Sequence, residues 1–416
     1  MDHAVLYLTL TAVFGLFMAW GIGANDVANA MATSIGSKAV TIRQALIIAA
    51  IFEFSGAVLA GGQVTATIRK GIVDVSVFAN QPELLIYGML ASLLASGVWL
   101  MIASRFGWPV STTHSIVGAI VGFAAVGVGV ETVHWGSVAT IVLGWVMSPI
   151  VAGVLAYLIF TSVQKFILER QDPLAAARRL IPLYMFLAGF TISAVTLLEG
   201  LSHVGLGVSM MQSYALAVGI GVAIAGAGAI IVRRIKVTPG SNRELHFGTI
   251  ERLFGVLQVV TACAMAFAHG SNDVANAIGP VAAVVSIVGN GAVGQTSAMP
   301  MWILMLGGAG IVIGLATFGR KVIATVGGGI TALTPSRGFS AELAAATTIV
   351  VGSGIGMPVS TTQTLVGAIL GVGLARGIAA IDLRVVRGIL LSWVVTVPAG
   401  ALLSMLIFFL IRLILG

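Results

Sequence analysis

Two short segments of the chain place an aspartate between two asparagines in apolar surroundings. They read GANDVANA at residues 23–30 and GSNDVANA at residues 270–277. On a helix, positions three and four residues apart share a face, so the polar side chains of each segment lie together. Carboxylate and amide oxygens are hard ligands that suit a small cation such as Na⁺. The candidate residues are Asn25, Asp26 and Asn29 in the first segment and Asn272, Asp273 and Asn276 in the second.

A second pair of segments combines a proline with three hydroxyl residues. PVSTT stands at residues 109–113 and again at 358–362. Proline, serine and threonine favour a helix start, and a helix N-terminus offers unpaired N–H groups and the positive end of the dipole. Ordinary capping would explain one such segment. Two copies predict a cradle for an oxyanion, made by Ser111, Thr112 and Thr113 and by Ser360, Thr361 and Thr362.

The composition around these motifs is that of an integral membrane protein. Of the 416 residues, 58% are hydrophobic and 8% are charged, and the mean hydropathy is +1.08, whereas soluble domains carry roughly a quarter charged residues. Apolar runs of about 20 residues recur, which is the length of a membrane-spanning helix. We therefore predict an all-α, multi-pass protein of the cell membrane, in contact with the lipid bilayer. The net charge of +7 lies in short loops, as in other membrane proteins, and does not indicate nucleic acid as a partner.

The landmarks of the first half return in the second half at a nearly constant offset. The offset is 247 for the Asn-Asp motifs, 249 for a 14-residue match that starts at PVSTT and has ten identities, 248 for Trp145 and Trp393, and 251 for the Arg-Lys pairs at residues 69 and 320. This order predicts a duplicated unit. We divide the chain into a first repeat at 1–168, a central helical hairpin with flanking cytoplasmic loops at 169–249, and a second repeat at 250–416.

The charges of the loops predict how the repeats are oriented. The basic stretches 164–180 and 233–252 are expected in the cytoplasm, and residues 277–319, which contain no Lys or Arg, are expected outside. Five segments per repeat and two in the hairpin make about 12 transmembrane segments. The second repeat is then inverted relative to the first, and both termini are external. Apolar runs stop near residues 24 and 270, where the Asn-Asp motifs begin. Inverted repeats with discontinuous half-helices are typical of secondary transporters.

Further polar residues inside apolar segments are candidates for coupling or gating. Glu53 lies in the middle of a segment, and the corresponding stretch 302–314 contains no acid. Ser148 and Thr396 occupy matching positions beside prolines, where their hydroxyls can donate to an anion or to their own helix backbone. His114 corresponds to Gln363, so a symmetric proton relay of two histidines is not available.

Together the Asn-Asp motifs and the twin PVSTT segments resemble the signatures of the inorganic phosphate transporter (PiT) family, over almost the whole chain. The resemblance implies a homodimer that takes up inorganic phosphate coupled to Na⁺ or H⁺. It also implies a phosphate site of the two Ser-Thr-Thr triplets with Asn29 and Asn276, and a cation site, with Na⁺ at both aspartates, of Asn25, Asp26, Asn272 and Asp273. The family often carries an acid like Glu53 in both repeats, whereas this chain has it once. Some members move sulfate, which makes a sulfate permease the alternative.

The expected function is secondary transport by alternating access, with no enzymatic activity and no cofactor other than the co-transported Na⁺ or H⁺. Two carboxylates beside an anion repel it unless cations bind with it. A channel would need basic rings or a continuous polar pore, and the sequence contains no HExxH, GxSxG or Cys/His cluster. Phosphate is favoured over sulfate because it can donate a hydrogen bond to a carboxylate, and arsenate is expected to compete with it.

Overall fold

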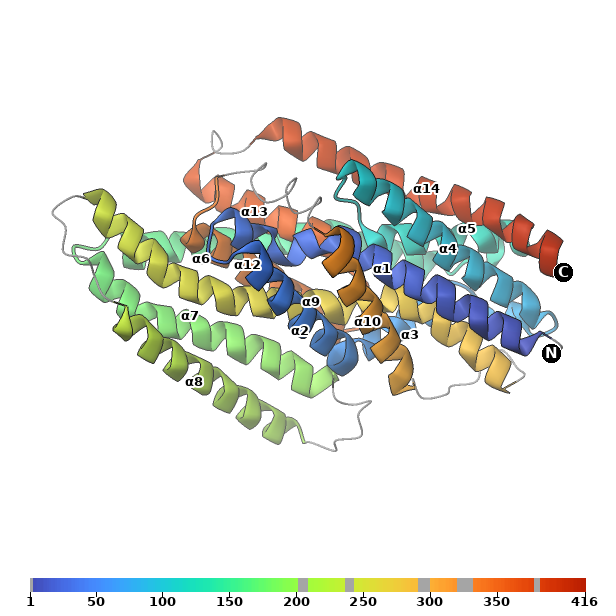
Figure 1. The fold of residues 1–416 in the computed structure, drawn as a ribbon, viewed down its shortest axis with the longest axis horizontal. Coiled ribbons are helices and arrows are strands. Elements are labelled where there is room, and N and C mark those ends of the chain that lie inside the picture. The colour runs from blue at the N-terminus through green and yellow to red at the C-terminus, as the bar shows by residue number, and fades with distance from the viewer. Residues whose placement is uncertain (1–2, 201–208, 236–242, 291–299, 320–331, 378–381) are drawn as a thin grey trace.

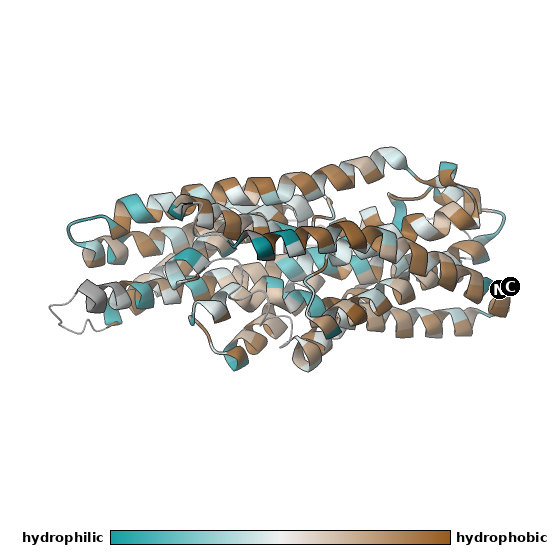
Figure 2. Ribbon diagram, turned by 90° about the horizontal axis from the view of Figure 1, so that it is seen from above, coloured by the Kyte–Doolittle hydropathy of each residue, from teal (hydrophilic) through white to brown (hydrophobic). Residues whose placement is uncertain are grey.

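The structure is a computed structural model that describes residues 3–200, 209–235, 243–290, 300–319, 332–377 and 382–416. Within these ranges the chain forms helices and no β-strand, and nine of the helices are long and apolar enough to cross a bilayer. The predicted all-α polytopic class is therefore confirmed. In Figure 1 the start of α1 and the end of α14 lie at the same end of an elongated bundle. In Figure 2 much of the helix ribbon is brown, the colour of hydrophobic residues, and teal hydrophilic residues are fewer.

The structure describes thirteen α-helices. In chain order they are α1 (Ala4–Gly36), α2 (Ile42–Ala60), α3 (Gly62–Lys70), α4 (Pro82–Phe106), α5 (Thr112–Gly127), α6 (Trp135–Val163), α7 (Pro173–Val195), α8 (Met210–Arg234), α9 (Arg243–Asn290), α10 (Met301–Phe318), α12 (Pro335–Gly354), α13 (Thr361–Arg376) and α14 (Leu383–Leu415). Two 3₁₀ turns at Val75–Phe78 and Val130–Thr132 and two π turns at Gln164–Leu168 and Thr196–Gly200 complete the described elements.

The helices α5 and α13 are the predicted half-helices. Each has 16 residues, too few for the roughly 20 that span a bilayer. Each begins directly after the serine of its PVSTT segment, because the serine side chain caps the helix: Ser111 Oγ accepts the N–H of His114 and Ser360 Oγ accepts the N–H of Gln363, both at 3.3 Å. With α12, these helices complete the twelve apolar segments counted in the sequence.

The two halves of the chain repeat the same elements and interlock through them. Both ends of α5 and α13 differ by 249 positions, and α6 and α14 begin 248 positions apart. The first helix of each half packs on the second helix of the other half, α1 on α10 and α9 on α2. A Cβ atom on Gly23 would lie 1.9 Å from the Ile311 carbonyl oxygen, and one on Gly270 would lie 2.1 Å from that of Glu53. Glycine therefore allows the backbones to touch at both crossings.

Both motif-bearing helices are longer than the sequence suggested. The apolar runs stop near residues 24 and 270, but α1 continues through its motif to Gly36 and α9 to Asn290. The polar side chains do not end the helices because they are buried against the other half of the protein. The boundary drawn at residue 250 falls inside α9, which begins at Arg243. Arg320 and Lys321 lie outside the described residues. The inverted orientation and the external termini stay predictions.

The half-helix contacts predict a strict size limit at Gly371. A Cβ atom there would lie 2.0 Å from the Gly153 carbonyl oxygen of α6, whereas one on Gly226 of α8 would meet nothing within 4 Å. Gly371→Ala should therefore lower the free energy of unfolding by about 1–3 kcal/mol, and Gly226→Ala should not lower it, because alanine favours helix. Thermal unfolding in detergent measures both. Equal melting temperatures for the two variants would contradict the backbone contact.

Candidate functional site

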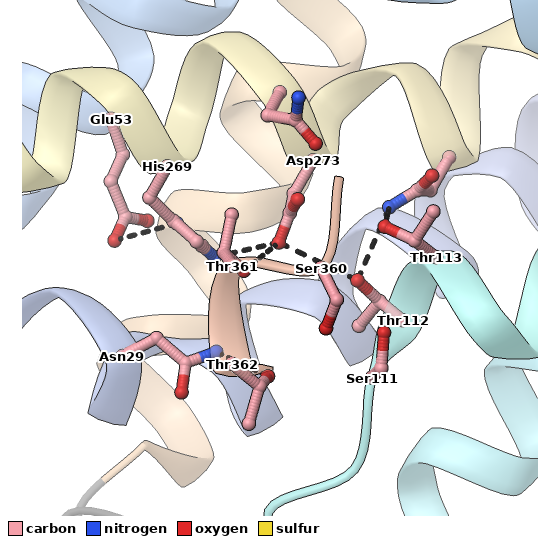
Figure 3. A network of polar contacts seen from close by, with 12 residues as sticks. Asn29, Glu53, Ser111, Thr112, Thr113, His269, Asp273, Ser360, Thr361 and Thr362 are labelled. Carbon is pink, nitrogen blue, oxygen red and sulfur yellow. Dashed lines mark hydrogen bonds and ion pairs between the residues drawn. The ribbon is translucent and has the colours of Figure 1, made fainter. Parts of the chain in front are cut away.

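Acidic side chains from three helices meet at the centre of the molecule. Three side chains each offer one possible metal-ligand atom, and these atoms lie within 4.8 Å of one another: Asp26 of α1, and His269 and Asp273 of α9. His269 lies between two carboxylates, with Nε2 3.1 Å from Asp273 Oδ2 and Nδ1 3.2 Å from Glu53 Oε1 of α2 (Figure 3). The side chains of this acidic centre, Asp26, Glu53, His269 and Asp273, are buried. His269 reaches Asp273 because the two are four residues apart on one helix face.

The acidic centre brings three carboxyl groups together with one imidazole. Even with His269 protonated, the ionised forms of Asp26, Glu53 and Asp273 would leave two negative charges without a counter-charge inside the centre. Charge in the membrane interior is costly unless it is paired. A bound cation or protonation of the carboxylates would compensate this charge.

The N-termini of the two half-helices converge on Asp273. Thr361 Oγ1 donates to Asp273 Oδ2 at 2.8 Å, and Thr112 Oγ1 lies 3.5 Å from the same oxygen (Figure 3). The next threonine of each triplet ties its half-helix to the loop before the other one. Thr113 Oγ1 donates to the carbonyl of residue 359 at 3.1 Å, and Thr362 Oγ1 to that of residue 110 at 3.2 Å. The hydroxyls of the two triplets thus converge, with the Asp273 carboxylate between Thr112 and Thr361; their binding of an oxyanion stays a prediction.

The four asparagines of the two motifs use their amide N–H groups to hold the surrounding helices. Asn29 Nδ2 donates to Thr362 Oγ1 at 2.7 Å, and Asn276 Nδ2 lies 3.2 Å from the hydroxyls of Thr112 and Thr113. The first asparagine of each motif donates to the loop before a half-helix. Asn25 Nδ2 reaches the Trp108 carbonyl at 3.0 Å and Asn272 Nδ2 the Met357 carbonyl at 3.3 Å.

Because the amide N–H groups make these bonds, several oxygens of the motifs remain without a hydrogen-bond donor. Six buried oxygens have no hydrogen-bond donor among the described residues: Asn25 Oδ1, both carboxylate oxygens of Asp26, Asn272 Oδ1, Asp273 Oδ1 and Asn276 Oδ1. Buried acceptors normally have a partner. Carboxylate and amide oxygens without a donor are the ligands that a hard cation requires.

Several predicted site residues lie away from the acidic centre or act differently. Ser111 and Ser360 cap their own helices, so Thr112 and Thr361 are the hydroxyls that reach Asp273. The sequence left open whether the Thr396 hydroxyl donates to an anion or to its own helix backbone. In the structure Thr396 Oγ1 donates to the Ser392 carbonyl of its own helix at 2.6 Å.

No hydrogen bond or ion pair among the described residues joins the remaining gating candidates to Asp273. The His114 ring packs against the Trp145 ring at a tilt of 44°, with ring centroids 3.9 Å apart. The Gln363 and Ser148 side-chain oxygens are buried without a partner in the described part of the chain. Of the five candidates, Glu53 alone makes a contact inside the acidic centre.

Two buried ionisable residues, His269 and Glu342, were not among the residues predicted from the sequence. His269 had a signal, since it precedes Asp273 by one helical turn. Glu342 of α12 is the single charged residue between positions 338 and 375. Its Oε1 accepts hydrogen bonds from Thr33 at 2.5 Å, from Ser34, and from Gln258 at 3.3 Å, and its Oε2 accepts one from Thr261 at 2.7 Å.

The known proteins that this chain resembles in the following comparisons are described as phosphate transporters or permeases. Residues 22–404 match a family described as the phosphate transporter family. A Haemophilus influenzae protein provisionally named a phosphate permease is 52% identical over 97% of this chain and 96% of its own. Inorganic phosphate transporter 2-1 of Arabidopsis thaliana is 44% identical over 95% of this chain and 70% of its own. A solved structure named "The sodium-dependent phosphate transporter" superposes with a TM-score of 0.92, at 39% identity, over 99% of this chain and 100% of that chain.

The bonds around Glu342 predict a large effect of neutralising it. In Glu342→Gln, an amide N–H group replaces one acceptor and faces hydroxyl donors, so we expect a loss of about 1–3 kcal/mol in unfolding free energy. Glu131→Gln, at an exposed position, is the matched control and should change it by less than about 0.5 kcal/mol. Melting temperatures of the purified proteins test this. A Glu342→Gln protein that melts with the control would refute the role assigned to the carboxylate.

Proposed function

The chain belongs to the phosphate transporter family, and we propose that it takes up inorganic phosphate by symport with a cation, through alternating access to the central site. The six donor-free oxygens around Asp26 and Asp273 carry this proposal. They lie beside a cradle of hydroxyls at two helix N-termini, so a cation site and an anion site adjoin. Binding of each ion lowers the electrostatic cost of binding the other.

The ligand types favour Na⁺ over H⁺ as the coupling ion. A proton would neutralise a carboxylate but leave the amide oxygens of Asn25, Asn272 and Asn276 without a partner. A sodium ion uses carboxylate and amide oxygens together. The matching solved transporter is named as sodium-dependent, which supports the same choice. Because every residue of the site comes from one chain, the homodimer implied by the family resemblance would leave each site complete.

Asp273 connects the two ions in the proposed mechanism. In the structure its carboxylate accepts the hydroxyl of Thr361 and lies within 3.5 Å of that of Thr112, so it stands where an oxyanion would bind. A cation between Asp26 and Asp273 draws this carboxylate toward itself and releases the two hydroxyls. Phosphate then takes them over, with Asn29 holding Thr362 and Asn276 holding Thr113 in place. The cation must therefore bind before the anion is held firmly.

The coupling scheme predicts the effect of removing either aspartate charge. Asp26→Asn and Asp273→Asn keep the side-chain size but should weaken Na⁺ binding about 10- to 100-fold, since a charged partner contributes about 1.5–3 kcal/mol. Labelled phosphate uptake into proteoliposomes under an imposed Na⁺ gradient should then fall to background. Asp172→Asn is the control, because Asp172 caps α7 at an exposed position and Asn caps equally well. Normal uptake by either central variant would refute the cation site.

The same carboxylates predict which anion is carried. Phosphate near neutral pH keeps a P–OH group that can donate to Asp26 or Asp273, whereas sulfate can only accept. An unmatched buried acceptor costs about 1–3 kcal/mol, which corresponds to roughly 10- to more than 100-fold discrimination. Excess arsenate, which shares the shape and protonation of phosphate, should compete with labelled phosphate, and excess sulfate should not. Competition by sulfate without competition by arsenate would move the assignment to a sulfate permease.

A further inference from the structure

The loop between α12 and α13 is held at four consecutive carbonyls. Each carbonyl from Gly356 to Val359 accepts a hydrogen bond from a side chain of another element. In order, the donors are Thr67 Oγ1 at 2.6 Å, Asn272 Nδ2 at 3.3 Å, Trp145 Nε1 at 3.2 Å and Thr113 Oγ1 at 3.1 Å. The third bond comes from α6 and fixes the carbonyl of Pro358, the first residue of the second PVSTT segment.

The corresponding loop between α4 and α5 shares two of these bonds and differs at the proline. The Trp108 carbonyl accepts from Asn25 and the Val110 carbonyl from Thr362, as the repeat requires. The Pro109 carbonyl lies 3.2 Å from Ser392 Oγ, but the same hydroxyl lies 2.7 Å from the Ile389 carbonyl of its own helix. A hydroxyl has one hydrogen to donate, so Pro109 is held more weakly than Pro358.

Trp393 is the repeat counterpart of Trp145, and its indole N–H is unused. Its Nε1 is buried without an acceptor among the described residues. The helices α5 and α14 touch at Gly118 and Val397, and one turn earlier the backbone of Trp393 lies near the His114 side chain, at the start of the half-helix that follows Pro109. A buried N–H group without an acceptor costs free energy. Trp393 is therefore close to the loop between α4 and α5 but does not hold that loop in this conformation.

We propose that Trp145 and Trp393 are alternating latches that position the two cradle loops. This inference rests on the proposed alternating access. In the present conformation Trp145 holds Pro358 and Trp393 is free. In the opposite conformation Trp393 donates to the Pro109 carbonyl, and Trp145 releases Pro358. The exchange makes one indole hydrogen bond for each one it breaks, so the two conformations stay close in free energy, as a transport cycle requires.

Two tryptophan variants with opposite expected effects test the latches. Trp145→Phe and Trp393→Phe keep an aromatic ring and remove the N–H donor. One hydrogen bond is worth about 0.5–1.5 kcal/mol, so each variant should shift the conformational equilibrium about 2- to 10-fold. Val359→Cys reports on the α12–α13 loop, and its side chain is buried in this structure. The background is Cys263→Ser, because Cys263 is the single native cysteine.

The rate at which a maleimide labels Val359→Cys in proteoliposomes should rise in Trp145→Phe and fall in Trp393→Phe. Val110→Cys, the buried counterpart in the other loop, is the matched reporter and should change in the reverse sense. Trp393→Phe remains informative if Trp145→Phe does not fold, because the Trp393 N–H bonds nothing in the described structure. Changes of the same sign in both variants, or no change, would overturn the latches. Phosphate uptake by the parent protein separately tests the proposed function.

Discussion

Burial of three carboxylates against a single imidazole is the interaction on which the rest of the structure depends. Asp26, Glu53 and Asp273 come from three helices and meet around His269. Burying ionised carboxylates in a membrane interior is costly unless donors or cations compensate their charge. The half-helices supply hydroxyl donors, several asparagine oxygens have no donor among the described residues, and glycines at the helix crossings let the backbones approach closely. The proposed ion coupling rests on this charge balance.

Much of this arrangement could be predicted because the sequence marks it twice. The paired Asn-Asp motifs and PVSTT segments identify the helices that carry the site. The proline and hydroxyl residues place the half-helix starts at Thr112 and Thr361, where the structure has them. Composition alone establishes the helical membrane class. These features are local or repeated, so a single sequence is enough to recognise them.

The remaining features depend on contacts between distant segments, which a single sequence does not record. Glu53 was recognised as a buried acid, but its partner His269 lies in the other half of the chain. Glu342 draws its donors from α1 and α9, and none of these neighbours follows from its own surroundings in the sequence. The serines of PVSTT have two possible roles, and only the backbone geometry shows that they cap their helices. Pairing between the two halves decided the cases of Glu53 and Glu342, and local backbone geometry decided that of the serines.

The interlocking of the halves has a consequence for biosynthesis. Asn29 donates to Thr362, a partner 333 residues further along the chain, and α1 packs on α10. While the ribosome is still translating the second half, α1 is already made, but Thr362 and α10 do not yet exist. Asn25 can reach Ser104 and Trp108 within the first half, whereas Asn29 must wait for its partner. The centre can therefore be completed only after the second half has entered the membrane.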